Sequence, residues 1–166
     1  MDLILWRHAE AEVAAQGDDD LSRALTSKGD RQAQRMAAWL DSHLPEGTRI
    51  LCSPAKRTEQ TAKALGRKFK LREELMPDSN ADAVLDLIKW HPETGPQGKG
   101  PVLLVGHQPY LGELVARLLG MPEQACAIRK GSVWWLRTRV REGQLHTVLL
   151  TVVCPDLISR SWDDRS

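Results

Sequence analysis

The chain begins with a short apolar run that leads directly into an arginine and a histidine, Leu3-Ile4-Leu5-Trp6-Arg7-His8. Four apolar residues are too few for a helix. They also lack the alternation of a half-exposed strand, so they predict a strand buried on both faces. Arg7 and His8 would then lie at the carboxyl end of this strand.

Two later segments repeat this pattern. Residues 49–52 are followed by Ser53-Pro54, and residues 102–105 are followed by Gly106-His107. We therefore expect three buried strands, each ending in residues with polar or catalytic side chains.

Helical patterns separate these strands. Thr26 is expected to cap a helix that ends before Pro45, because apolar residues recur after it every three or four positions. Ser53 and Pro54 predict the cap and first turn of a second helix that runs to about Lys68. Further helices are predicted for residues 81–90 and 111–119, with a surface loop over residues 95–101.

The last third of the chain is rich in β-forming residues. Residues 133–136 and 145–153 predict a hairpin whose strands are joined by Glu142-Gly143. Together with the strand and helix alternation, this predicts an α/β fold with a mostly parallel sheet covered by helices on both faces. We expect one domain over residues 1–155 and a polar tail over residues 156–166, in which Trp162 suggests some docking.

The composition limits the classes of partner and the cellular compartment that we expect for this protein. The 166 residues carry 23 Lys and Arg against 22 Asp and Glu, a net charge of +1, which predicts neither a nucleic-acid nor a membrane partner. No apolar run is long enough to span a bilayer, and the start does not resemble a signal peptide. Cys52, Cys126 and Cys154 are too scattered for a zinc site or a disulfide scaffold, so we expect reduced thiols and a cytoplasmic protein.

The strand ends predict phosphoryl chemistry. In open α/β sheets ligands bind beyond the carboxyl ends of the strands, where Arg7, His8 and His107 would meet Arg57 from the second helix. Arginine matches phosphate oxygens as a planar fork, and a neutral histidine can attack phosphorus. A second histidine, kept protonated by the phosphate, could stabilise charge. Activity is then expected to fall between pH 7 and pH 4 as His8 protonates.

Four blocks in this order resemble the signature of the histidine phosphatase superfamily. They are Arg7-His8, Leu25-Thr26-Ser27-Lys28-Gly29, the segment from Ser53-Pro54-Ala55-Lys56-Arg57 to Ala62, and Val105-Gly106-His107. The short chain, with little inserted between the blocks, is similar to the SixA-type phosphohistidine phosphatases of that superfamily.

The resemblance implies a phosphoglycerate mutase-like fold, a three-layer α/β/α sandwich, and a role for each matching residue. His8 would be the nucleophile, Arg7 and Arg57 would clamp the phosphoryl oxygens, and His107 would complete the pocket. The substrate-binding residues would be Arg23 at the rim, together with Ser53 and Gly106. No metal and no cofactor are expected, and Asp18-Asp19-Asp20 is interpreted as a solvated loop.

Two positions depart from the family pattern. Ala9 stands where glycine is usual, which would penalise a positive φ. Members that act on alcohol esters usually carry an acidic proton donor on an insertion, and the matching stretch here is only Glu74-Leu75-Met76-Pro77-Asp78. Glu10, Glu12 or the Asp18–Asp20 run could still supply a proton.

The favoured hypothesis is a metal-independent phosphatase with a phosphohistidine intermediate that acts on phosphohistidine in a signalling or phosphocarrier protein. The imidazole of such a substrate leaves without a strong acid. Two alternatives stay open: a broad phosphomonoesterase of the same superfamily, and a phosphate-sensing module without turnover. The oligomeric state is not predicted.

Overall fold

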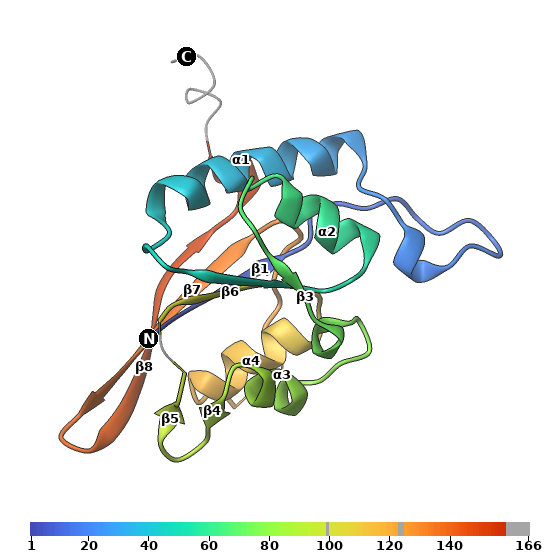
Figure 1. Cartoon of the computed structure of the whole chain (residues 1–166). Helices are drawn as coiled ribbons and strands as arrows, with labels where there is room; N and C mark the ends of the chain where they lie inside the picture. The colour runs from blue at the N-terminus through green and yellow to red at the C-terminus, as the bar shows by residue number, and fades with distance from the viewer. Residues whose placement is uncertain (99, 123–124, 159–166) are drawn as a thin grey trace.

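The α/β prediction is confirmed by a computed structural model that describes residues 1–98, 100–122 and 125–158. A six-stranded sheet has the order β3-β2-β6-β1-β7-β8 (Figure 1). Its strands are β1 (Asp2–Arg7), β2 (Arg49–Cys52), β3 (Lys70–Leu71), β6 (Val102–Gly106), β7 (Val133–Arg141) and β8 (Gln144–Val153). The helices are α1 (Ser27–His43), α2 (Lys56–Lys63), α3 (Ala81–Leu87) and α4 (Tyr110–Leu118).

The register of the parallel strands aligns their carboxyl ends. Strands β1, β6, β2 and β3 are parallel, with Arg7 opposite Gly106 and Cys52 opposite Val105. The residues that follow these strands, His8, His107 and Ser53, are therefore brought to one edge of the sheet. Strand β7 runs antiparallel to β1 and β8 antiparallel to β7.

The helices form a layer on each side of the sheet. In Figure 1, α1 and α2 cover one face, while α3 and α4 cover the other. Ile4 and Trp6 pack toward the first layer with Met36 and Leu40, and Leu3 and Leu5 belong to a second core cluster with residues of α3 and α4. Both faces of β1 are buried, which explains its unbroken apolar run.

Three predicted boundaries are wrong. Helix α2 begins at Lys56 after Ala55, without a side-chain cap, and ends at Lys63 instead of Lys68. Ser53 is not its cap, because that hydroxyl has another partner. Helix α3 ends at Leu87, and the chain continues into β4 (Trp90–His91), which pairs with β5 (Gly95–Pro96) in the segment predicted as a loop.

Thr26 is confirmed as the cap of α1, since its side chain accepts a hydrogen bond from the Gly29 N–H. The hairpin is also confirmed. Glu142 and Gly143 have φ values of 52° and 74°, the left-handed conformation that a two-residue turn between β7 and β8 requires. Trp134 and Trp135 lie on opposite faces of β7, each packed against a different core cluster.

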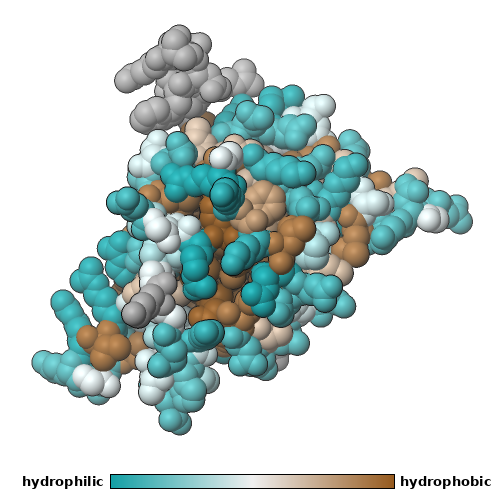
Figure 2. All heavy atoms as spheres, viewed as in Figure 1, coloured by the Kyte–Doolittle hydropathy of each residue, from teal (hydrophilic) through white to brown (hydrophobic). Residues whose placement is uncertain are grey.

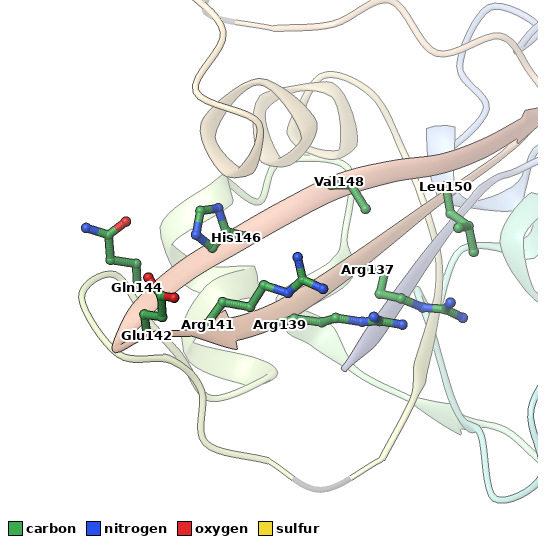
Figure 3. A pocket seen from close by; sticks show the side chains of 8 residues that line it. All are labelled: Arg137, Arg139, Arg141, Glu142, Gln144, His146, Val148 and Leu150. Carbon is green, nitrogen blue, oxygen red and sulfur yellow. The ribbon is translucent and has the colours of Figure 1, made fainter.

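The β7–β8 hairpin extends past the start of β1, at the end of the sheet opposite His8. Arg137 pairs with Asp2 there, and the ribbon continues to the turn at Glu142. Figure 3 shows Arg139, Arg141 and His146 along this ribbon, beside an open hollow of about 820 Å³. This hollow is separate from the strand ends that carry the candidate site residues.

One face of the surface is mostly hydrophilic (Figure 2), and the last described residues contact α1. Figure 2 shows hydrophilic residues over most of one face, with apolar residues in a central band. Residues Pro155–Leu157 form a 3-10 helix in contact with α1, and Asp156 pairs with Arg129 at 2.9 Å. Trp162 lies outside the described residues. No helix in the described ranges is long and apolar enough to cross a membrane.

Candidate active site

His8 is held by main-chain contacts on both sides. Its N–H donates to the Gly106 carbonyl at 3.1 Å, and its own carbonyl accepts from Gly131 N–H at 2.9 Å. The ring Nδ1 lies 2.7 Å from the Ala9 carbonyl oxygen. A carbonyl can only accept, so we assign the ring proton to Nδ1. Nε2 therefore keeps its lone pair, as a nucleophile at phosphorus requires.

Ala9 fits the position where the family usually has glycine. Its side chain is fully buried in a small cluster with Ala11, Leu25 and Ala33. Its N–H donates to Thr61 Oγ1 at 3.1 Å. Among the described non-glycine residues only Lys89 and Glu142 have a positive φ, so the penalty considered from the sequence does not arise at Ala9.

Arg7 and Arg57 are each anchored through one part of the guanidinium. Arg7 Nη1 donates to the Ile128 carbonyl at 2.7 Å. Arg57 Nη1 and Nη2 donate to the Asp20 carbonyl and carboxylate, at 2.9 Å and 3.1 Å. Within the described residues, the Nε atoms of both arginines are buried without a hydrogen-bond partner. Each arginine thus keeps its side edge, formed by Nε and one N–H of Nη2, for an oxyanion.

His107 lies beside His8, with 5.3 Å between the ring centroids. Its Nε2 is 2.8 Å from Ser53 Oγ, which is the partner that replaces the predicted cap role of Ser53. In the described part of the chain its Nδ1 is buried and has no partner. We assign the Ser53 proton to this contact, so that Nδ1 carries the ring proton and can donate to an oxyanion while the ring is neutral.

Tyr110 contacts the main chain of His107. This residue was not identified from the sequence. Its Oη accepts from the His107 main-chain N–H at 3.2 Å and donates to the Leu75 carbonyl at 2.5 Å. Gly106 makes this possible, because a Cβ there would overlap Oη and lie 2.9 Å from Cζ. The structure thus gives Gly106 a packing role, together with its carbonyl contact to His8. The sequence feature that could have identified Tyr110 is a tyrosine three residues after the Gly106-His107 pair.

Burial and clustered cations keep both imidazoles neutral. Burial is the largest cause that lowers the pKa of His8 to about 3; Arg57 and Arg7 add to it and the Ala9 contact opposes it. Burial and then His8 and Arg57 lower the pKa of His107 to about 2. The predicted protonation of His107 depends on a bound phosphate, and it stays a prediction, because a bound anion would raise the pKa of both rings.

The loop from Glu10 to Leu25 brings a carboxylate to the arginines, which the sequence interpretation of a solvated Asp18–Asp20 run missed. Asp20 accepts from Arg57 and also from Arg23 Nε, at 2.9 Å. Arg23 Nη1 reaches the Glu12 carbonyl at 3.2 Å. Arg23 is also one of the cations that lower the pKa of His107, which is consistent with its predicted place at the rim.

Several other carboxylates considered as proton donors are occupied elsewhere. Glu10 Oε2 accepts from the Thr26 hydroxyl at 2.7 Å, and Glu74 pairs with Arg72 at 2.9 Å. Asp19 accepts from the Leu21 N–H at the start of the 3-10 helix η1 (Asp20–Ser22). Across the described ranges, three or more His, Cys, Asp or Glu side chains do not gather as metal ligands would.

The chain is similar to proteins of a known family. The model of the histidine phosphatase superfamily (branch 1) matches residues 3–80. The phosphohistidine phosphatase SixA homolog of Haemophilus influenzae is 34% identical over 133 residues, which cover 72% of this chain and 78% of that protein. The chain belongs to the histidine phosphatase superfamily.

Further similarities place this histidine phosphatase in the SixA-type group. Phosphohistidine phosphatase SixA of Escherichia coli is 31% identical over 121 residues, covering 71% of this chain and 74% of that protein. A structure of the protein histidine phosphatase SixA complexed with tungstate aligns with a TM-score of 0.75 and 25% identity, covering 96% of this chain and all of that one. The resemblance stated from the sequence is confirmed, as is the phosphoglycerate mutase-like architecture.

Proposed function

We propose that this protein is a metal-independent phosphatase that forms a phosphohistidine at His8 and dephosphorylates phosphohistidine on a signalling or phosphocarrier protein. One observation carries the proposal. In the part of the chain that the structure describes, the buried polar side-chain atoms without a partner are Arg7 Nε, Arg57 Nε and His107 Nδ1. All three belong to residues around His8, and all three are donors suited to the equatorial oxygens of a phosphoryl group.

In the first step, His8 Nε2 attacks phosphorus and the bond from phosphorus to the substrate imidazole breaks. When the other nitrogen of the substrate ring carries a proton, that ring leaves as a neutral imidazole. The ring proton of His8 stays on Nδ1 throughout, where it is donated in a hydrogen bond to the Ala9 carbonyl. One phosphorus–nitrogen bond replaces another, so the transfer needs no proton at the broken bond.

In the second step, water attacks the phosphoryl group on His8. Its oxygen bonds to phosphorus, the bond to Nε2 breaks, and both water protons leave with the phosphate, which then releases one to solvent. Arg7, Arg57 and His107 hold the equatorial oxygens in both steps, where fixed donors stabilise the charge of the transition state. His8 returns to its neutral form.

The acids near the site favour phosphohistidine over an alcohol ester. An alkoxide leaving group needs a proton in the transition state, whereas an imidazole does not. Glu10 is bonded to Thr26 and Asp20 is bonded to two arginines, so neither is a free acid at the site. The two curated SixA relatives are phosphohistidine phosphatases by name, which supports the same substrate class here. We place the reaction in the cytoplasm, in keeping with three free cysteines.

The test compares two substrates in the presence of EDTA. The purified protein is incubated with a histidine-phosphorylated phosphocarrier protein and, separately, with an aryl phosphate, and phosphate release is followed. We expect fast release from the first and little from the second, with no loss on chelation. Equal release from both would favour the phosphomonoesterase alternative. Tungstate binding without release from either would favour the phosphate-sensing module.

A further inference from the structure

Asp20 joins two arginines through separate oxygens. Its Oδ1 accepts from Arg23 Nε at 2.9 Å, and its Oδ2 accepts from Arg57 Nη2 at 3.1 Å. Its main-chain carbonyl also accepts from Arg57 Nη1 at 2.9 Å. A single residue of η1 therefore holds the end edge of Arg57 at two points and fixes Arg23 beside it.

The engaged edge determines which edge remains. A guanidinium can present an end edge, formed by Nη1 and Nη2, or a side edge, formed by Nε and Nη2. Asp20 occupies the end edge of Arg57, so the buried side edge is left for a phosphoryl group. Without Asp20 the guanidinium could turn its end edge to the anion instead, and the fork would be displaced from the attack line of His8.

The negative charge of Asp20 also lies between the positive charges of Arg23 and Arg57. Burial is the largest cause that lowers the pKa of Arg57. The charge of Asp20 opposes this shift, and the repulsion from Arg23 adds to it. The Arg57 side chain is only 4% exposed, whereas that of Asp20 is 55% exposed. An ion pair that is half in water contributes little to stability, so its effect is expected on orientation rather than on folding.

We infer that Asp20 is a positioning residue, which orients Arg57 and Arg23 for phosphoryl transfer and does not itself touch the reacting atoms. This inference rests on the proposed function. This role differs from that of a proton donor, which the sequence analysis left open for the Asp18–Asp20 run. Partial burial opposes the change, but Arg57 and Arg23 hold the pKa of Asp20 below its usual range, so the carboxylate carries no proton to donate.

The test uses Asp20→Asn, Asp20→Glu and the control Asp18→Asn, which makes the same charge change in the same loop. For each, kcat and KM are measured with a histidine-phosphorylated phosphocarrier and with an aryl phosphate, and inhibition by inorganic phosphate is titrated. Thermal unfolding checks that each variant is folded. We expect Asp20→Asn to lower kcat by roughly 10- to 100-fold on both substrates, relative to Asp18→Asn.

The same variant should bind inorganic phosphate as well as the wild type or more tightly, because one negative charge is removed. Asp20→Glu should recover part of kcat. Equal kcat in Asp20→Asn and Asp18→Asn would overturn the inference while leaving the proposed function intact. A loss confined to the aryl phosphate would also overturn it, because that is the result expected of a proton donor. A wild type without turnover would overturn the proposed function, and this inference with it.

Discussion

Gly106→Ala tests whether the packing beneath His107 is as tight as the structure shows. The added Cβ would overlap Tyr110 Oη and lie 2.9 Å from Cζ and 3.2 Å from Cε2. Tyr110 is completely buried and cannot move away without losing its bonds to the His107 N–H and the Leu75 carbonyl. The substitution is therefore expected to disturb the candidate site and the core together.

The cost can be estimated from these contacts. Overpacking a buried position costs about 1–3 kcal/mol. Losing two buried hydrogen bonds adds about 1 kcal/mol each. We expect the free energy of unfolding to fall by roughly 3–5 kcal/mol, and turnover to fall as well, because the main chain of His107 is held by Tyr110.

The assay is urea denaturation of Gly106→Ala, Tyr110→Phe and the double variant. Removing Oη relieves the worst overlap and loses the same two hydrogen bonds. The double variant should therefore be more stable than the sum of the single effects by about 2 kcal/mol for the two bonds counted twice, plus the relieved part of the overpacking cost. Gly98→Ala is the control, since a Cβ there would have its nearest contacts at 3.6 Å. A Gly106→Ala protein as stable as the Gly98→Ala protein, or strictly additive effects, would show that Tyr110 does not pack tightly against Gly106.

Three further predictions concern the charged site. Arg57→Ala should lower kcat/KM by roughly 100- to 1,000-fold in steady-state assays, and its exposed neighbour Lys56→Ala should not. Because the pKa of His8 is about 3, the acid limb of kcat/KM from the free protein should lie below about pH 4, after correction for substrate ionisation; a limb near 6.5 from His8 would contradict this. Both imidazoles bind protons more readily when unfolded, so stability should fall as pH drops from 6.5 toward 3, by about 1.4 kcal/mol per unit for each ring. In urea denaturation His107→Asn should therefore show a shallower fall, and an unchanged slope would count against a neutral buried His107.

The positions of the site residues could be predicted from the sequence, but the pKa of His8 could not. The residue pattern places Arg7, His8 and His107 at strand ends, and parallel strands have to bring those ends together. It cannot supply the burial that moves the pKa of His8 from 6.5 to about 3. A fall in activity between pH 7 and pH 4 was expected from the ordinary pKa of histidine, and the structure moves that transition to lower pH.

Contacts within one turn of the chain could be predicted from the sequence, whereas contacts between distant residues could not. Thr26 caps α1 within its own turn, so a short sequence motif sufficed to predict it. Ser53 followed by proline gives an equally good cap motif. However, its hydroxyl lies 2.8 Å from His107 Nε2, a partner 54 residues away. Asp20 and Arg57 meet across 37 residues through a loop without regular periodicity, so no local pattern could pair them.

The central claim is that His8 carries the phosphoryl group, and rapid quenching tests it most directly. The protein is mixed with a histidine-phosphorylated phosphocarrier, stopped with alkali within the first turnover, and mapped by mass spectrometry beside His8→Ala. We expect a phosphohistidine on the peptide that contains His8, formed and lost at the rate of turnover, and no turnover in His8→Ala. Phosphate release without phosphate on that peptide, or wild-type turnover in His8→Ala, would contradict it.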